Sequence, residues 1–269
     1  MLTVRGQAAT TQLVRMPPAI HVERVDKYFA SRGGDLVQAL AEVDLEIQPG
    51  QFVSLVGPSG CGKSTLLRLL VGLGAPSSGS IEVGGTPVSG PRREVSLVFQ
   101  QPLLLPWATI LENVLLPVEI QHLDRRAALE RAAQLLEMVG LSEFKDRYPK
   151  ELSGGMQQRA ALVRGLVTDP GLLLLDEPFA ALDAMTRERL NLELLAIWER
   201  TRKTVVLVTH SIDEAVFLSD RVVCFSPRPG RIVRDIPIDL PRPRTLHDRA
   251  TPAFDAAAAE IRDLFYGHV

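Results

Sequence analysis

GPSGCGKST, residues 57–65, directly follows the apolar run FVSLV (52–56) and leads into KSTLLRLL (63–70). The apolar run predicts a strand buried on both faces, and the leucines beyond the loop predict a helix. Glycines let successive backbone N–H groups turn toward one anion, and a helix N-terminus adds partial positive charge. The sequence therefore predicts a strand–loop–helix unit that binds phosphate.

The spacing of the glycines and of Lys63 and Ser64 within this loop matches the P-loop pattern. In such a loop we expect the Lys63 ammonium to contact the β- and γ-phosphates and the Ser64 hydroxyl to bind Mg²⁺. Thr65 is expected to hold the α-phosphate. The predicted nucleotide-binding residues of the loop are Gly57, Pro58, Ser59, Gly60, Cys61, Gly62, Lys63, Ser64 and Thr65.

The composition of the 269 residues fits one large α/β unit and disfavours several other classes. A formal net charge of −2 gives no support for a basic nucleic-acid-binding surface. The two cysteines, Cys61 and Cys224, lack metal-ligand spacing and indicate a reducing compartment. We interpret Cys61 as a small residue that fits its loop, with a redox role as the alternative. No apolar run predicts a membrane-spanning helix, and the N-terminal residues lack the continuous apolar stretch expected of a secretory signal, so we expect any membrane role to require a partner.

Strand and helix patterns alternate along most of the chain, which is typical of a mostly parallel sheet covered on both faces. From about residue 109 to 168 the pattern is helical, and SIEVGGTPV (80–88) predicts a hairpin turning at Gly84–Gly85. Further strands are expected at AEVDLEI (41–47), VSLVF (95–99), LLLLD (172–176), TVVLVTH (204–210) and RVVCF (221–225). Further helices are expected near 184–200, 212–219 and 254–265.

The segment LLLLDEP (172–178) is a predicted buried strand that ends in two acids. Asp176 at the strand end is positioned to hold Mg²⁺, usually through water, and Glu177 to orient and polarise an attacking water. One acid after a strand is commonly an ordinary turn residue. Two adjacent acids in a chain that already carries a P-loop favour a catalytic role.

The segment LSGGMQQR (152–159) places Ser153, Gly154 and Gly155 before a predicted helix. The hydroxyl and the free amides form a second anion site, although the same residues alone are more often a plain N-cap and turn. The P-loop already surrounds the phosphates of one nucleotide. A second phosphate-binding helix end is best explained if it contacts a nucleotide held by another copy of the chain.

With these three motifs in this order, the chain resembles the nucleotide-binding subunits of the ABC transporter family over roughly residues 20–234. The resemblance implies a RecA-like P-loop NTPase α/β core with an antiparallel β subdomain and a helical subdomain. It implies an ATPase domain at 20–235, with the helical subdomain at about 101–168. We assign 1–19 to an N-terminal extension and 236–269 to a C-terminal extension, which we interpret as a cap on the core rather than a regulatory segment.

The resemblance also implies roles for single residues outside the three motifs. Gln100 corresponds to the Q-loop glutamine that contacts Mg²⁺ and the water, and Asp183 corresponds to the D-loop aspartate. His210 corresponds to the switch histidine on the γ-phosphate. Phe29 corresponds to the aromatic residue that stacks on adenine, and Tyr28 is the alternative.

A single cassette without membrane helices is the importer arrangement in this family. QQPLLLPWATILENVLLP (100–117), together with SPRPGRIVRDIPIDLPRPR (226–244), resembles the nitrate, sulfonate and taurine importer group, and uptake systems for pyrimidines or other small anions share these features. The resemblance implies ATP and Mg²⁺, an ATP-sandwich homodimer, membrane permease subunits and, indirectly, a solute-binding protein. The expected location is peripheral, on the cytoplasmic face of the inner membrane.

Other classes of P-loop protein fit the sequence less well. Chromosome-type ATPases insert a very long coiled coil between P-loop and signature, whereas about 90 residues separate Lys63 from Ser153 here. Translation-type members carry two tandem cassettes, and metabolite kinases lack LSGGMQQR. A purely regulatory ATP-binding module is expected to have lost Lys63 or Glu177.

Overall fold

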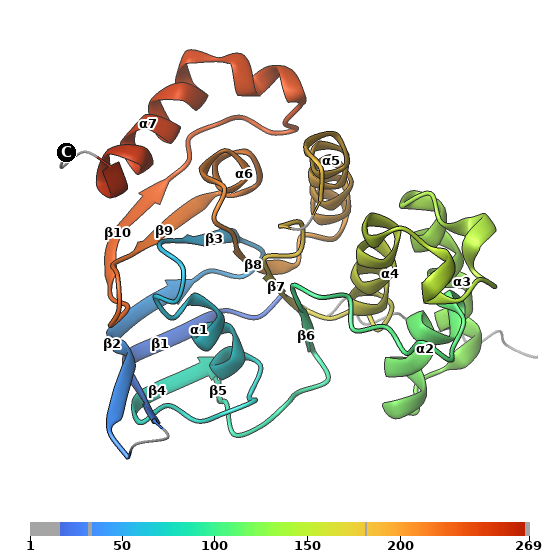
Figure 1. Ribbon diagram of the computed structural model, residues 1–269, viewed down its shortest axis with the longest axis horizontal. Coiled ribbons are helices and arrows are strands. Elements are labelled where there is room, and N and C mark those ends of the chain that lie inside the picture. Colours follow the sequence, from blue (N-terminus) through green and yellow to red (C-terminus); the bar gives the residue numbers. More distant parts are fainter. Residues whose placement is uncertain (1–16, 32–33, 181, 267–269) are drawn as a thin grey trace, which may run out of the picture.

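The computed structural model describes residues 17–31, 34–180 and 182–266. Most of the extension proposed at 1–19 therefore lies outside the described residues. The described chain forms two sheets, a helix between them, a helical layer over the outer face of the larger sheet, and a separate helical group at one side (Figure 1). This is the α/β fold with a β subdomain and a helical subdomain that the sequence predicts.

The larger sheet positions the functional loops. Its central strands are buried along their whole length, which agrees with their uninterrupted apolar runs. Five neighbouring strands are parallel, and the edge strand β10 is antiparallel to β9. In pairing order the strands are β10 (Ile232–Pro237), β9 (Arg221–Phe225), β3 (Phe52–Val56), β8 (Thr204–Val208), β7 (Leu172–Asp176) and β6 (Val95–Val98).

The smaller sheet is antiparallel throughout. Along β2 (Leu36–Ile47) the side chains of Val43, Leu45 and Ile47 are buried and alternate with exposed charged residues, as the sequence pattern predicts. The strand is longer than expected because its first half pairs with the aromatic end of the strand before it. In pairing order the strands are β2 (Leu36–Ile47), β1 (Ile20–Ala30), β4 (Ser78–Val83) and β5 (Thr86–Pro87).

Helix α1 (Lys63–Leu70) lies between the two sheets and contacts β2 and β4 on one side and β7 and β8 on the other. Its leucines are buried in one continuous core with residues from both sheets. The helix that begins in the phosphate-binding loop therefore joins the two sheets.

Three helices cover the other face of the larger sheet (Figure 1). They are α5 (Ala184–Thr201), α6 (Ile212–Leu218) and α7 (Pro252–Tyr266). The side group consists of α2 (Ile110–Ile120), α3 (Arg125–Met138) and α4 (Gly154–Leu166), with 3₁₀ turns at Ser142–Phe144 and Pro149–Glu151. This group has its own apolar core and joins the larger sheet where α4 contacts β6. Among the described helices, none is long and apolar enough to span a bilayer.

The segment after β9 completes the core of the larger sheet. Strand β10 runs to Pro237 and so crosses the boundary proposed at 235, after which a 3₁₀ turn (Leu246–Ala250) precedes α7. Ile238, Phe254 and Ile261 are buried in the same core as α5 and α6. Arg244 is 4% exposed, and its guanidinium donates hydrogen bonds to the carbonyls of Val216, Phe217, Ser219 and Leu240.

We predict that Arg244→Leu lowers the free energy of unfolding by about 2–4 kcal/mol, because four carbonyl groups lose their donor. Urea denaturation measures this change. Arg234→Leu, at an exposed position of β10, serves as the control and is expected to change the free energy by less than about 0.5 kcal/mol. Equal effects of the two substitutions would contradict a structural role for Arg244.

Candidate functional site

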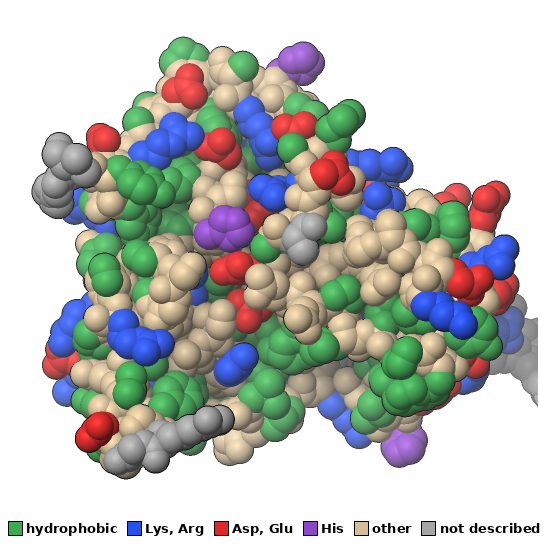
Figure 2. All heavy atoms as spheres, in the orientation of Figure 1, with side chains coloured by type: hydrophobic (Ala, Val, Ile, Leu, Met, Phe, Trp, Pro, Cys, Tyr) green, Lys and Arg blue, Asp and Glu red, His purple; other side chains and the backbone are tan. Residues whose placement is uncertain are grey.

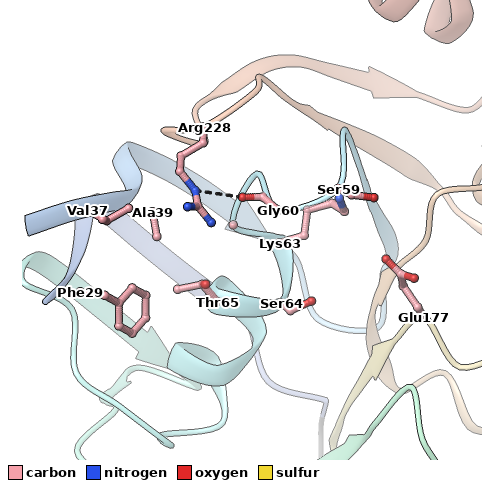
Figure 3. Close-up of a pocket in the computed structure, with 11 residues that line it drawn as sticks. Phe29, Val37, Ala39, Ser59, Gly60, Lys63, Ser64, Thr65, Glu177 and Arg228 are labelled. Atoms are coloured by element: carbon pink, nitrogen blue, oxygen red, sulfur yellow. Dashed lines mark hydrogen bonds between the residues drawn. The ribbon is translucent and has the colours of Figure 1, made fainter. Parts of the chain in front are cut away.

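The phosphate-binding loop and the start of α1 form one wall of a cavity of about 400 Å³. The β1–β2 hairpin and the turn after β9 form the other walls (Figure 3). The cavity is lined by Phe29, Val37, Ala39, Ser59, Gly60, Gly62, Lys63, Ser64, Thr65, Glu177 and Arg228. Most of the predicted loop residues therefore line one cavity, together with the acid that follows β7.

Two glycines fix the course of the loop. Gly57 and Gly62 have φ values of 156° and 112°, which side chains disfavour. A Cβ on Gly62 would lie 2.7 Å from the Ala39 carbonyl oxygen, and one on Gly57 would lie 2.9 Å from that of Phe225. Only glycine at both positions lets the loop approach β2 and β9 this closely.

The Lys63 ammonium lies inside the loop. Its side chain is almost fully buried, and Nζ donates to the carbonyl oxygens of Gly57 at 2.7 Å and Pro58 at 2.9 Å. Cys61 is buried beside it, with Sγ 3.5 Å from Nζ. The loop thus holds a full positive charge at the position where the sequence predicts a phosphate.

Ser64 and Asp176 meet where α1 begins and β7 ends. The Ser64 hydroxyl donates to Asp176 Oδ1 at 2.7 Å. Burial raises the pKa of the Asp176 carboxyl, an effect that the hydrogen bond from Ser64 opposes. A hydroxyl and a carboxylate side by side are hard oxygen ligands of the kind that Mg²⁺ prefers, so these two residues fit a magnesium site.

Gln100, Glu177 and His210 follow β6, β7 and β8, three neighbouring parallel strands. Their ends lie at one edge of the sheet, which brings the three side chains together. Glu177 Oε2 lies 3.4 Å from Gln100 Nε2 and 3.4 Å from His210 Nδ1. Glu177 also has a φ of 46°, a strained conformation of the kind that often occurs at functional sites.

The turn that carries His210 is stabilised by hydrogen bonds among residues that the sequence motifs did not identify. The Thr209 hydroxyl donates to the buried Glu214 carboxylate and accepts a hydrogen bond from the Ser211 amide at 3.1 Å. Burial raises the pKa of Glu214. The only sequence signal was that Ser211 and Glu214 have the spacing of an N-cap and its third helical residue.

Phe29 and Tyr28, the two aromatic candidates, lie differently. The Phe29 side chain lines the cavity, where Figure 3 shows it facing the loop from the hairpin side. Tyr28 is not among the residues that line the cavity. A cavity with an aromatic ring at one end and a phosphate-binding loop along one wall fits a nucleotide, with the base against the ring and the phosphates in the loop.

The structure leaves the signature and D-loop residues outside this cavity. Ser153 caps α4 by accepting from the Met156 amide at 3.3 Å, and Asp183 caps α5 by accepting from the Thr186 amide at 2.9 Å. A Cβ on Gly154 would meet no atom within 4 Å, so its backbone faces open space. Their roles toward a nucleotide of another copy remain predictions.

Val37, Ala39 and Arg228 line the cavity without having been predicted. Ala39 approaches the loop only because the two sheets meet there, which no local pattern encodes. Arg228 belongs to the Pro-rich stretch 226–244, which the sequence analysis used only for a subgroup resemblance.

The comparisons with known proteins agree with this geometry. The family model described as "ABC transporter" matches residues 40–180, which is more than half of the chain. The chain belongs to the ABC transporter family. A solved dimeric ATP-binding cassette in a post-hydrolysis state, bound to ADP and Pi, has a TM-score of 0.74 and 33% sequence identity to this cassette. The match covers 82% of this chain and 99% of that one.

Three relatives carry the names of transport systems, two of them import systems. The nitrate import ATP-binding protein of Synechocystis sp. is 42% identical over 92% of this cassette and 96% of its own length. The taurine import ATP-binding protein of Rhizobium johnstonii is 42% identical with the same two coverages. The bicarbonate transport ATP-binding protein of Synechococcus elongatus is 46% identical over 90% of this cassette but only 37% of its own length.

We predict that Phe29→Ala weakens the affinity of the cassette for ATP by roughly tenfold, the size expected for loss of one aromatic stacking partner. Isothermal titration of Mg-free ATP measures the affinity. Tyr28→Ala is the matched control and is expected to change it less than about twofold. A larger effect of Tyr28→Ala would assign the stacking to Tyr28 instead.

Proposed function

We propose that this cassette is the ATP-hydrolysing subunit of an ABC importer, in which two copies power the uptake of a small solute through separate membrane subunits. The observation that carries the proposal is the meeting of Gln100, Glu177 and His210 beside the Lys63 loop. A loop alone serves any nucleoside triphosphate. A carboxylate at the phosphate end, between an amide and an imidazole, adds the means to hydrolyse one.

In the proposed complex the loop 57–65 surrounds the phosphates of ATP, and Phe29 stacks on the adenine. Lys63 exchanges its loop carbonyl partners for phosphate oxygens, which costs little because the ammonium is already inside the loop. Ser64 and Asp176 would hold Mg²⁺, with Gln100 as a further ligand. Bound there, the cation neutralises charge on the β- and γ-phosphates.

Hydrolysis is assigned to Glu177 and the residues around it. The Glu177 carboxylate accepts the proton of a water that attacks the γ-phosphorus, while the bond between that phosphorus and the β,γ-bridging oxygen breaks and ADP leaves. His210 and Gln100 hold the carboxylate and the water in place. The Glu177 backbone is strained, with a φ of 46°, and in this conformation its carboxylate lies within 3.4 Å of both Gln100 and His210.

Pairing of two copies completes the proposed site. Ser153, Gly154 and Gly155 lie outside the cavity of their own chain, and the α4 N-terminus they form presents amides to solvent. In the proposed dimer this helix end contacts the phosphates held by the partner, and Asp183 lies at the same contact. The related solved cassette is described as dimeric, which supports this arrangement.

The solute is proposed from the names of the relatives. Nitrate, taurine and bicarbonate each carry a small oxyanion group, so we infer a solute of that kind. Side chains of this cassette need not contact the solute. Exposed Leu103 and Trp107, next to Gln100, form the apolar surface proposed to dock a permease, with a solute-binding protein on the other side of the membrane. With this docking, we propose that the cassette lies peripherally on the cytoplasmic face of the inner membrane.

A cassette that acts on DNA or RNA is a weaker candidate. In Figure 2 the Lys and Arg side chains on the visible face are interspersed with acidic and apolar ones, whereas nucleic-acid-binding proteins gather basic residues on one face. The net charge of −2 agrees with this mixed surface.

Glu177→Gln keeps the shape of the side chain and removes the proton acceptor. We predict that it lowers kcat for ATP hydrolysis at least a hundredfold, leaves ATP affinity within about threefold, and traps an ATP-bound dimer. Phosphate release measures kcat, isothermal titration measures the affinity, and size-exclusion chromatography with light scattering measures the dimer. Normal hydrolysis by this variant would refute the catalytic assignment.

Lys63→Ala removes the charge that the loop holds for the phosphates. We predict that ATP affinity falls at least tenfold, because a charge-assisted hydrogen bond to phosphate is lost. Isothermal titration measures the affinity, and circular dichroism confirms that the variant is folded. Unchanged affinity in a folded variant would contradict nucleotide binding at this loop.

A further inference from the structure

The cavity contains a second cation that the function proposed above leaves unused. Of the residues that line it, Lys63 and Arg228 are the two with basic side chains. Lys63 is buried within its loop, whereas Arg228 is exposed on the turn between β9 and β10. The two cations thus approach the cavity from different segments of the chain.

The turn that carries Arg228 is closed by its own hydrogen bonds. The Ser226 amide donates to the Arg231 carbonyl at 2.9 Å, and the Arg231 amide donates to Ser226 Oγ at 3.0 Å. Ser226 Oγ also donates to the Pro229 carbonyl at 3.1 Å. These bonds give the turn a defined shape, so the starting point of the Arg228 side chain is fixed.

The same turn is seated directly on the phosphate-binding loop. The Gly230 amide donates to the Ala39 carbonyl at 3.0 Å, and the Gly230 carbonyl accepts from the Ala41 amide at 3.0 Å. A Cβ on Gly230 would lie 2.0 Å from the Cys61 carbonyl oxygen, so glycine is required for this approach. The turn, β2 and the loop therefore form one packed unit around the cavity.

Figure 3 shows the Arg228 side chain pointing from this turn into the cavity, toward Gly60. Its Nε donates to the Gly60 carbonyl at 3.3 Å, the one hydrogen bond that the guanidinium makes within the described part of the chain. The remaining N–H groups of the guanidinium are available to a ligand in the cavity. Oxygens of a phosphate are the acceptors that this planar group matches best.

We propose that Arg228 binds the phosphates that ADP and ATP have in common. This inference rests on the proposed function. In Figure 3 Arg228 lies over the Gly60 and Ala39 part of the cavity, while Glu177, assigned to the γ-phosphate, lies at the far side. Arg228 is therefore a nucleotide-binding residue at the α- and β-phosphates, separate from the hydrolytic residues.

The test compares three ligands in the full-length Arg228→Gln protein, each titrated calorimetrically without Mg²⁺. We expect the affinities for ATP and for ADP to fall by the same factor, roughly tenfold, because one charge-assisted contact is lost. The affinity for adenosine is expected to stay within about twofold, since adenosine has no phosphate. Arg228→Lys keeps the charge but lacks the planar guanidinium. Its affinities for ATP and ADP are expected to lie between those of the unchanged protein and those of Arg228→Gln.

Arg231→Gln is the matched control, because Arg231 lies in the same turn, pairs with Glu42 at 2.9 Å and does not line the cavity. It is expected to leave all three affinities unchanged. Equal loss for adenosine, a loss confined to ATP, or no loss for ADP would each overturn the assignment of Arg228. If Lys63→Ala weakens ATP binding while Arg228→Gln does not, this inference alone fails; if neither does, the proposed function fails as well.

Discussion

The site depends on how closely one loop can approach two strands of different sheets. Gly57 lies against the Phe225 carbonyl at the end of β9, and Gly62 lies against the Ala39 carbonyl of β2. Because neither residue has a side chain, the loop closes the junction between the antiparallel and the parallel sheet. Helix α1 then leaves this junction and packs on both sheets. A larger residue at either position would separate the sheets and open the cavity.

From this junction the parallel sheet supplies the rest of the site. Strands β6, β7 and β8 run side by side in the same direction, so the loops that follow them lie next to one another. Glu177 lies between Gln100 and His210 for this reason, and Asp176 reaches Ser64 at the start of α1. Separations of 3.4 Å around Glu177 leave the three side chains close without locking them to one another.

Much of this arrangement could be predicted from the sequence, because its motifs are local. FVSLV and the loop after it specify a buried strand, a turn and a helix within a short stretch, and LLLLDEP specifies a strand that ends in acids. The roles of Gln100 and His210 came from the resemblance to the ABC transporter family, and the order of β6, β7 and β8 explains why both lie beside Glu177.

The contribution of the turn 226–231 could not be predicted from local patterns. Gly230 contacts Cys61 although the two residues are far apart in sequence, and only the order of the strands brings them together. The buried carboxyl of Glu214 was missed for a similar reason, since an exposed helix start and a buried one share the same sequence pattern. Between Phe29 and Tyr28, only the cavity lining distinguishes the two, because neighbouring residues of a strand point to opposite faces and no local pattern tells which face meets the loop.

Helices α2, α3 and α4 pack around an apolar core of their own, which adjoins the core of the larger sheet through α4. Ile110, Val114, Ala132 and Leu136 pack among themselves and not in the core of the sheets. Hydrogen exchange can therefore report an opening of this group while the amides of β3 and β8 stay protected. Helix α4 belongs to both cores, since Ala160 and Val163 lie in the helical core while Leu162 and Leu166 lie in the core of the larger sheet, so this helix connects the signature residues to the sheet.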